Sequence, residues 1–385
     1  MKFSVAKSEL YNSLHKIIGV VPQKTTIAVL NCLLMEVENN QLNLTGTDLE
    51  ISVTTSLPVE GSENGIMAVP ARLLADIVKE LPDVPLTLYS HEGNKLVIET
   101  EKGEYKIATQ PKEDFPKINV EESVLTLDLS SDKVIHLINK TIFAVSADEL
   151  RPALTGINME LLPDELRFVA TDGHRLSKIV FSNFDSPVKE KRNFIIPTKT
   201  LNLLLRNVEN DDRVNIQIGE DHIVFQLQTA TIYSKLINGA YPNYERVIPT
   251  DNDKRLVVNR DLLLATLRRV SIFSSSLTRQ VRLVITPNEL TIRSEDIEFG
   301  AEAKEMIPAS FSAEWMQIGY NSNYFIDILR HVDGEEVIIE LKDSMSAAVM
   351  FPSEQQEKEE HLMLLMPIRI NEESYEGESS SEENE

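Results

Sequence analysis

The chain has 385 residues, of which 42% are hydrophobic and 26% are charged, a composition typical of a globular protein with two or three domains. No apolar run reaches the roughly 20 residues that cross a bilayer, and the N-terminus lacks a signal-peptide core, so we expect a cytoplasmic protein. A formal net charge of −23 argues against nucleic-acid binding unless the basic residues are gathered on one surface.

Cys32 is the only cysteine, so the chain can form neither an internal disulfide nor a thiolate metal site. It lies in an apolar, strand-like run, which predicts a buried structural thiol. The alternative, a catalytic nucleophile, has no supporting residue nearby in the sequence.

In chain order, the elements repeat with a period of roughly 124 residues. Each copy begins with a short alternating strand and a helix, continues with strands, and then has a second helix followed by further strands. The predicted helices cover 7–24, 71–80, 131–143, 198–208, 260–270 and 322–331.

These repeats predict an α+β fold with three tandem copies of one domain, each containing two helices and an antiparallel sheet. Polar linkers place the domains at 1–120, 121–252 and 253–370. Residues 371–385 hold seven Glu and no Lys or Arg, so we expect a disordered acidic tail.

Charge is divided between the helices and the rest of the chain. The six predicted helices hold thirteen basic and six acidic residues, although the whole chain is strongly acidic. One explanation is that exposed helix faces are simply rich in lysine. The other is that the helices line a surface for a polyanion, with contacts to phosphates rather than to bases, since no base-reading motif is visible.

Four segments then carry a resemblance: "TGTDLE" at 45, "VATDGHRL" at 169, "YPNYERVIP" at 241 and "MPIRI" at 366. With the three repeats in register over about 1–370, the chain resembles the bacterial DNA polymerase III β subunit family, the sliding clamps. The resemblance implies a head-to-tail homodimer that forms a six-domain ring around duplex DNA. It also implies a processivity factor without catalysis, cofactor, metal or membrane contact.

The resemblance implies partners as well. Such clamps tether the replicative polymerase α subunit, and a separate clamp loader opens them; these and other proteins bind through short peptides. The pocket residues that match are Leu154, Thr171, Gly173, His174, Arg175, Leu176, Pro242, Arg246, Val247, Tyr324, Met345, Met366, Pro367 and Ile368.

The DNA contacts are predicted partly from the resemblance and partly from the charged helices. Lys24 and Lys199 match positions where clamps usually carry a basic residue, whereas the others rest mainly on the helix argument. The complete set is Lys24, Arg72, Lys199, Arg206, Arg268 and Arg269.

The dimer contact is expected between Tyr105 and Ile107, on an edge strand, and Ile272 and Phe273 of the other subunit. The alternative for Ile272 and Phe273 is that they belong to the core of their own domain.

Two rival functions remain. Asp172, His174 and Arg175 around Gly173 could form the active site of a hydrolase or lyase, but no phosphate loop, metal-spaced histidine pair or nucleophile elbow accompanies them. Because Asp172 aligns with Asp48 in the first copy and with the pair Glu295 and Asp296 in the third, a turn acid that bonds to the backbone explains it better. A peptide-binding scaffold that does not bind nucleic acid is the second rival.

Overall fold

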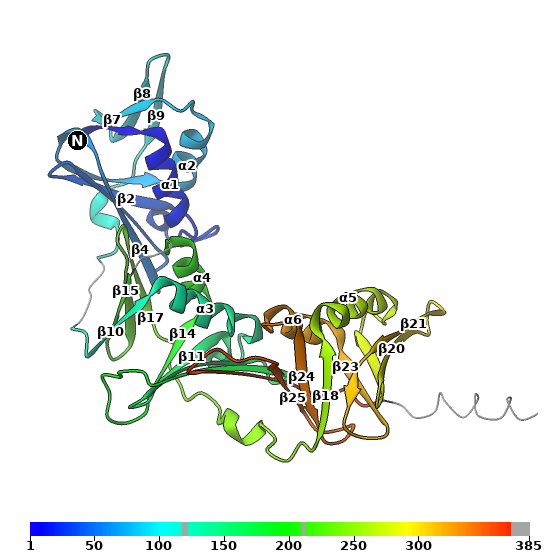
Figure 1. Ribbon diagram of the computed structural model, residues 1–385. Coiled ribbons are helices and arrows are strands. Elements are labelled where there is room, and N and C mark those ends of the chain that lie inside the picture. Colours follow the sequence, from blue (N-terminus) through cyan, green and yellow to red (C-terminus); the bar gives the residue numbers. More distant parts are fainter. Residues whose placement is uncertain (118–121, 210–212, 371–385) are drawn as a thin grey trace, which may run out of the picture. The chain divides into compact units, whose positions relative to one another are not determined.

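The computed structural model describes residues 1–117, 122–209 and 213–370, so the predicted tail 371–385 lies outside the described residues. Three tandem copies of a mixed helix and sheet domain are present. Close contacts divide the chain into two compact units, one of residues 1–136 with 194–238 and one of 137–193 with the residues from 239 on. Figure 1 colours the elements along the chain.

Unit 1 contains two antiparallel sheets. The smaller has the strand order β5 (Glu60–Glu63), β1 (Lys2–Ala6), β7 (Pro85–His91), β8 (Lys95–Thr100) and β9 (Gly103–Ala108). The larger has the order β10 (Leu125–Ser130), β15 (Arg213–Ile218), β16 (His222–Gln226), β17 (Ala230–Lys235), β4 (Ile51–Pro58), β3 (Gln41–Thr47), β2 (Cys32–Glu38) and β6 (Gly65–Pro70).

Three helices of unit 1 share one face of the larger sheet: α1 (Lys7–Ile17), α2 (Ala71–Glu80) and α4 (Thr198–Asn207). Helix α1 contacts both α2 and α4, and all three helices pack against strands of the larger sheet. Their apolar residues recur every three or four positions, so one stripe of each helix is buried and the charged residues remain outside. Helix α3 (Ser131–Asn139) and strand β14 (Arg192–Pro197) span the boundary between the units.

Unit 2 also contains antiparallel sheets. One runs β11 (Gly156–Leu161), β12 (Glu165–Thr171), β13 (Arg175–Ser182), β26 (Glu359–Leu365), β25 (Ala348–Pro352), β24 (Glu336–Leu341), β18 (Lys254–Asn259) and β22 (Ser310–Phe311). The other, the four-stranded sheet, runs β21 (Ala301–Pro308), β20 (Glu289–Asp296), β19 (Gln280–Thr286) and β23 (Met316–Asn321).

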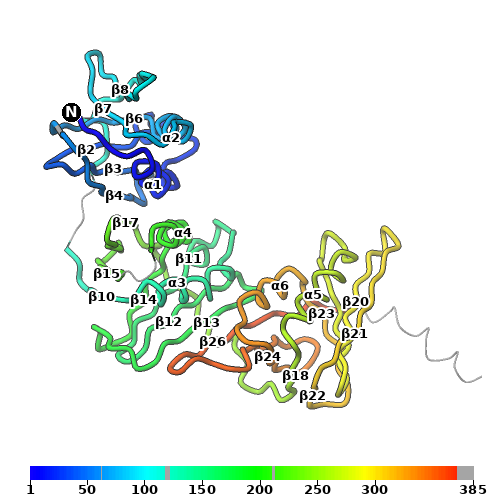
Figure 2. Tube along the Cα trace, turned by 45° about the horizontal axis from the view of Figure 1, so that its top comes forward, coloured from blue at the N-terminus to red at the C-terminus, as the bar shows by residue number. Residues whose placement is uncertain are grey.

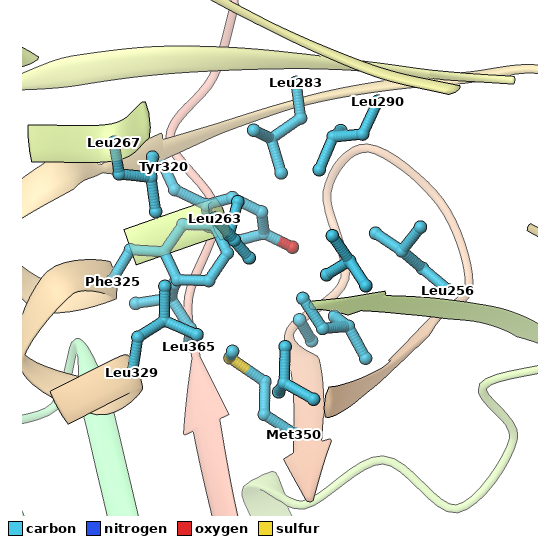
Figure 3. Packing of buried hydrophobic residues seen from close by; sticks show 14 of the residues in the cluster. Leu256, Leu263, Leu267, Leu283, Leu290, Tyr320, Phe325, Leu329, Met350 and Leu365 are labelled. Atoms are coloured by element: carbon cyan, nitrogen blue, oxygen red, sulfur yellow. The ribbon is translucent and has the colours of Figure 1, made fainter. Parts of the chain in front are cut away.

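Helices α5 (Arg260–Val270) and α6 (Ser322–His331) pack against each other and against the sheets of unit 2. Figure 3 shows side chains from both helices meeting those of the strands, including Leu263, Phe325 and Leu283. Each leucine buried in this way contributes about 1.5–3 kcal/mol, so the core holds the helices rigidly on the sheets.

Strand pairing crosses from one repeat to the next. Strand β17 of the second copy pairs with β4 of the first, and β13 of the second copy pairs with β26 of the third. The second repeat is therefore shared between the two compact units, which do not follow the repeat boundaries expected from the sequence.

All six predicted helices form, but two predicted ends are wrong. The helix expected over 7–24 ends at Ile17, because Pro22 cannot continue a helix and disfavours the helical conformation of Val21. Lys24 therefore lies in a turn. The helix expected over 131–143 ends at Asn139, and Lys140 is buried with its Nζ on the carbonyl oxygen of His331 at 2.7 Å.

Cys32 lies on β2 and is buried, with Val29, Ala68 and Phe115 as apolar neighbours. Burial raises the pKa of its thiol, which disfavours the reactive thiolate. The prediction of a structural thiol is confirmed.

Candidate functional site

The turn that follows α1, residues Gly19–Lys24 (the cationic turn), receives basic side chains from two other helices. Arg72 Nη2 donates to the carbonyl oxygen of Val21 at 3.2 Å, and Lys199 Nζ donates to that of Val20 at 3.5 Å. Arg72 lies in the first turn of α2 and Lys199 in the first turn of α4, so elements of two repeats meet at one turn.

Arg206, near the end of α4, reaches the same turn. A Cβ on Gly19 would stand 2.9 Å from its Nη1 and 3.1 Å from Leu203 Cδ2, so the guanidinium occupies space that only a glycine leaves open. Lys24 is exposed at the end of the turn. Four of the six predicted DNA residues are therefore gathered here, although three of them come from distant parts of the sequence.

One acidic side chain lies among these cations. Lys199 Nζ forms an ion pair with Asp48 Oδ2, while the side chain of Lys199 stays partly exposed. Exposed ion pairs of this kind contribute only about 0–1 kcal/mol, so a phosphate can compete for the ammonium group.

The remaining two predicted DNA residues lie at the end of α5, in unit 2. Arg268 and Arg269 are both exposed, but Arg269 forms an ion pair with Glu305 of β21, with Nη2 and Oε2 2.6 Å apart. The hydrogen bond between them raises the pKa of Arg269 and lowers the pKa of Glu305. Arg268 is therefore the better candidate of the two for binding an anion.

The acid–base–cation group that suggested an active site is a turn. Asp172 Oδ1 accepts hydrogen bonds from the backbone N–H groups of His174 at 2.8 Å and Arg175 at 3.0 Å. Asp48 Oδ1 accepts from the amides two and three residues on, at 3.1 and 2.7 Å, and Asp296 Oδ1 does the same at 3.1 and 3.4 Å. The interpretation as a repeated turn acid is confirmed.

Neighbouring residues complete this turn. Thr171 Oγ1 donates to the carbonyl oxygen of Arg175 at 2.6 Å and accepts from the N–H of Gly173 at 3.1 Å. Gly173 has φ +91°, in the left-handed region that favours glycine. In the first copy Leu49 has φ 80°, a strained conformation for a leucine, so the turn is kept even without its glycine.

Arg175 is only 9% exposed, and it joins β13 to helix α6. Its Nε lies 3.2 Å from Asp172 Oδ2, and its Nη1 lies 2.6 Å from Asp327 Oδ2. The guanidinium carbon is 4.8 Å from the ring centre of Tyr324 and 5.6 Å from that of Phe143, which are cation–π distances. Arg175 is therefore a structural cation beneath the surface.

Aromatic rings extend this contact in both directions. His174 stacks on Tyr324 with ring centres 5.7 Å apart, and His331 stacks on Phe143 at 4.2 Å. Together with Arg175, these residues form one continuous stack of five flat groups (the aromatic stack). Only His174, Arg175 and Tyr324 were expected at this site, and the sequence carries no signal for Phe143 or His331.

A small apolar cluster, separate from the main core, lies on the face of β13 opposite to Arg175, since consecutive residues of a strand point to opposite faces. Leu176 is fully buried in it with Tyr244 and Val349, and Tyr241 packs against its side. Leu154 is also buried. The predicted pocket residues that are exposed are Gly173, His174, Pro242, Arg246, Val247, Met345 and Met366, and those partly exposed are Thr171, Tyr324, Pro367 and Ile368.

A buried carboxylate anchors the segment 241–247. Glu160, on β11, accepts a hydrogen bond from the Tyr244 hydroxyl at 2.9 Å, and Arg167 bonds to Glu245 at 3.2 Å. Burial raises the pKa of Tyr244, so its hydroxyl remains a donor. Glu160 was missed from the sequence, where its only signal is a charge inside the apolar strand "GINMEL".

The segment "MPIRI" continues the sheets of unit 2 beyond β26. Met366 N–H donates to the carbonyl oxygen of His174, and Ile368 N–H donates to that of Gly319, each at 2.8 Å. The C-terminal pocket residues therefore lie next to those from "ATDGHRL", as the resemblance implies.

The predicted dimer residues differ in exposure. Tyr105 is exposed on β9, an edge strand, but Ile107 is 1% exposed because it points into the core of its own domain. The Ile107 side chain therefore packs within its own domain, and the contact of this edge strand with a partner stays a prediction. Ile272 is 76% exposed and Phe273 is also exposed, which excludes the alternative that they are core residues.

No group of three or more His, Cys, Asp or Glu side chains within 1–117, 122–209 and 213–370 could hold a metal ion. None of the helices in that part of the chain combines the length and apolar character that a bilayer span requires.

Family models match the chain almost from end to end. They describe the N-terminal domain of the DNA polymerase III beta subunit over residues 1–119, its central domain over 128–243 and its C-terminal domain over 245–369.

Individual proteins agree with this match. The Beta sliding clamp of Pseudomonas aeruginosa is 33% identical, over 96% of this chain and 100% of the relative. The solved structure of that organism's clamp bound to griselimycin has a TM-score of 0.91 at 33% identity, and the one from Bartonella birtlesii, also bound to griselimycin, has 0.90 at 32%. Each covers 96% of this chain and 100% of the other.

Proposed function

The chain belongs to the DNA polymerase III beta subunit family, the sliding clamps, and from that membership we propose how its surfaces are used. The family is one of non-catalytic processivity factors in DNA replication. The chain is therefore a DNA sliding clamp that tethers a polymerase to its template through peptide binding.

We propose that two copies join head to tail into a six-domain ring, with domains at 1–120, 121–252 and 253–370. Strand β9 ends one sheet of unit 1 and β21 ends the four-stranded sheet of unit 2, so each presents unpaired backbone groups to a partner. The exposed Ile272 and Phe273 are in the short helix Ser271–Phe273, which packs against β20 and β21. An apolar group beside an open strand edge favours a heterologous contact, in which two different surfaces of the subunits meet. Repeating such a contact gives a closed assembly when its rotation completes a ring.

The cationic turn is the observation that best supports DNA contact. Lys24, Arg72, Lys199 and Arg206 gather at one turn of a protein whose net charge is −23, so the positive charge is concentrated where the helices are. Contacts of this kind neutralise phosphates without reading bases, which permits sliding. We include Arg268 and Arg269 in the same role.

The surface around His174 is proposed to bind partner peptides. Exposed methionine and valine side chains, with Met366 joined to His174 by a backbone hydrogen bond, offer an adaptable apolar site, since methionine repacks easily around different ligands. The proposed ligands are segments of the polymerase α subunit, the clamp loader and other clamp-binding proteins. Because the bacterial chromosome lies in the cytoplasm, we propose that location.

Retention on DNA tests this function. Protein loaded onto a nicked circular plasmid by a clamp loader should co-elute with the plasmid after gel filtration in high salt, and it should be lost when the plasmid is linearised. A topological link explains both results, because salt weakens phosphate contacts but does not open a ring.

Equal retention on circular and linear DNA would contradict the ring. Failure to remain on circular DNA, together with normal peptide binding, would instead support the peptide-binding scaffold that does not encircle DNA.

A further inference from the structure

Of the four cations at the cationic turn, only Lys199 has a carboxylate partner within the described residues, and that partner is Asp48. Asp48 lies in the turn between β3 and β4, in the first repeat, whereas Lys199 lies in the first turn of α4, in the second. The pair therefore brings a negative charge to the surface where phosphates are proposed to bind. A carboxylate at that position competes with the phosphates for the same ammonium group.

The backbone holds the Asp48 carboxylate in place. Its Oδ1 accepts hydrogen bonds from the N–H groups of Glu50 at 3.1 Å and Ile51 at 2.7 Å. Thr47 Oγ1 supports the same turn by donating to the carbonyl oxygen of Ile51 at 3.0 Å. The second oxygen, Oδ2, thus stays in one position whether or not Lys199 is bound to it, and the acid needs no ordering when the ammonium group returns.

The backbone beneath Lys199 is fixed as well. Thr200, the next residue, is buried, and its Oγ1 lies 2.6 Å from Ser234 Oγ. Ser234 on β17 is directly opposite Ile51, the first residue of β4. Figure 2 shows β4 and β17 side by side, with α4 next to β17. Both ends of the ion pair therefore stand on one rigid seam, and the part that can turn towards a phosphate is the Lys199 side chain, which is 46% exposed.

The hydrogen bonds of Lys199 differ from those of Arg269, another predicted DNA residue. Arg269 donates to both oxygens of Glu305, at 2.9 Å from Nε to Oε1 and 2.6 Å from Nη2 to Oε2. Lys199 instead has one carboxylate oxygen, with the carbonyl oxygen of Val20 3.5 Å away. An ammonium group has three N–H donors, so one remains for a phosphate while the pair is still formed. The Lys199 pair is therefore suited to exchange, whereas the bidentate pair is suited to persist.

We propose that Asp48 is an internal counter-ion for Lys199 that shortens each contact of this lysine with a DNA phosphate. When the phosphate leaves, the ammonium group pairs again with Asp48 Oδ2, so leaving requires less free energy than it would for an unpaired lysine. The protein then moves along the duplex without a firm hold at this point. This inference rests on the proposed DNA contact of the cationic turn.

The substitution Asp48→Asn tests the counter-ion in the full chain. Asparagine keeps an oxygen for the two backbone N–H groups but loses the charge that binds Lys199. In about 0.05 M salt the variant should bind a short DNA duplex about two- to fivefold more tightly than the parent, the range of exposed ion pairs, as measured by fluorescence anisotropy. The gain should fade in 1 M salt, where charges are screened.

Glu50→Gln is the matched control. Glu50 lies two residues from Asp48 in the same turn, and it is exposed and paired with Lys235 at 3.2 Å, so its substitution removes the same charge but spares the Lys199 pair. Asp48→Asn should bind the duplex more tightly than Glu50→Gln. Equal affinities would indicate a general charge effect and would overturn the proposal. Weaker binding by Asp48→Asn would also overturn it, because the acid would then only support Lys199.

Lys199→Gln separates this inference from the DNA contact itself. The variant should bind the duplex more weakly than the parent, and adding Asp48→Asn to it should give no gain beyond that of Glu50→Gln. Unchanged affinity of Lys199→Gln would refute the proposed contact, and the counter-ion with it. If Lys199→Gln binds more weakly but the gain from Asp48→Asn persists in the double variant, the contact stands and the counter-ion alone is refuted.

Movement on DNA gives a second readout. Single-molecule tracking of the loaded protein on a stretched duplex with blocked ends should show slower diffusion of Asp48→Asn than of Glu50→Gln in low salt. Retention on circular DNA should be the same for both variants, since a topological link does not depend on phosphate contacts. Equal diffusion coefficients of the two variants would overturn the proposal.

Discussion

Replacing Arg175 by alanine should destabilise unit 2 and weaken partner peptides together. Arg175 is 9% exposed and has carboxylate oxygens of Asp172 and Asp327 at 3.2 and 2.6 Å. Removing one member of a buried ion pair costs about 3–5 kcal/mol, because the other charge loses its partner. Each cation–π contact, with Tyr324 and Phe143, adds about 0.5–2 kcal/mol. Asp327 is partly exposed and can recover water, so we expect a loss of about 3–5 kcal/mol in total.

Hydrogen exchange and peptide binding should be measured on the same samples. Amides of β13 and α6 should exchange faster in the Arg175→Ala variant, since the side chain joins these two elements. The affinity for a fluorescein-labelled peptide from the polymerase α subunit should also fall, because His174 and Tyr324 lose the group that holds their stack.

Two further variants separate support from direct contact. The double variant Arg175→Ala, Asp327→Asn removes one orphaned charge and should recover part of the stability. Arg246→Ala, at an exposed position, should change stability by less than about 0.5 kcal/mol whatever it does to peptide binding. Lost peptide binding in Arg175→Ala with stability within about 1 kcal/mol of the parent would refute the argument, since that result requires direct contact with the ligand.

Three further predictions concern other sites. Arg206→Gln should lower the slope of log affinity for DNA against log salt by about 0.9, the effect of one phosphate contact, and an unchanged slope would exclude Arg206 from the contact. Ile272→Ala combined with Phe273→Ala should yield monomers in sedimentation at micromolar concentration, whereas an intact dimer would reject the proposed interface. Burial lowers the pKa of His331 in the folded chain, so the unfolded chain binds the proton first as the pH falls. Stability should therefore decrease from about pH 6.5 downward, and His331→Gln should remove this dependence in denaturant titrations at several pH values.

Periodicity predicted the elements better than their ends. The six helices follow from apolar residues every three or four positions, which any amphipathic helix on a sheet requires. The first helix was predicted to continue to Lys24, but it ends earlier because Pro22 cannot continue a helix. From the sequence, Lys140 was expected on the exposed face of a helix. Instead, the carbonyl oxygen of His331 and the carboxylate of Asp333 bind its ammonium group inside unit 2.

The gathering of residues from distant segments could not be derived from the pattern alone. Gly19 and Arg206 are far apart in the sequence, and only the packing of α4 beside α1 brings the guanidinium over the glycine. Glu160 is a similar case. Burying a carboxylate costs free energy unless it is hydrogen-bonded, and the hydrogen bond here comes from Tyr244, which is distant in the sequence. Resemblance supplied the pocket residues, but it did not distinguish exposed His174 from buried Leu176.

The repeated turn explains how three copies of one domain acquire different surfaces. In the first two copies one carboxylate oxygen holds the backbone amides, which leaves the second oxygen for a cation. Asp48 forms an ion pair with Lys199, which connects the acid-containing turn of the first copy to the cationic turn. Asp172 forms an ion pair with Arg175, which supports the aromatic stack.

In the third copy the residue after the acid is Ile297, which is 87% exposed, at the end of the hairpin formed by β20 and β21. The acid again accepts hydrogen bonds from the amides two and three residues on, and this turn presents an apolar side chain next to an open strand edge. If that edge forms the ring contact, one turn supports DNA binding, peptide binding and assembly in successive repeats. Exchanging only the side chains around the acid should then alter one function without unfolding the turn. Ile297→Asn tests this directly, since it should weaken dimers in sedimentation and leave the hydrogen bonds to Asp296 intact.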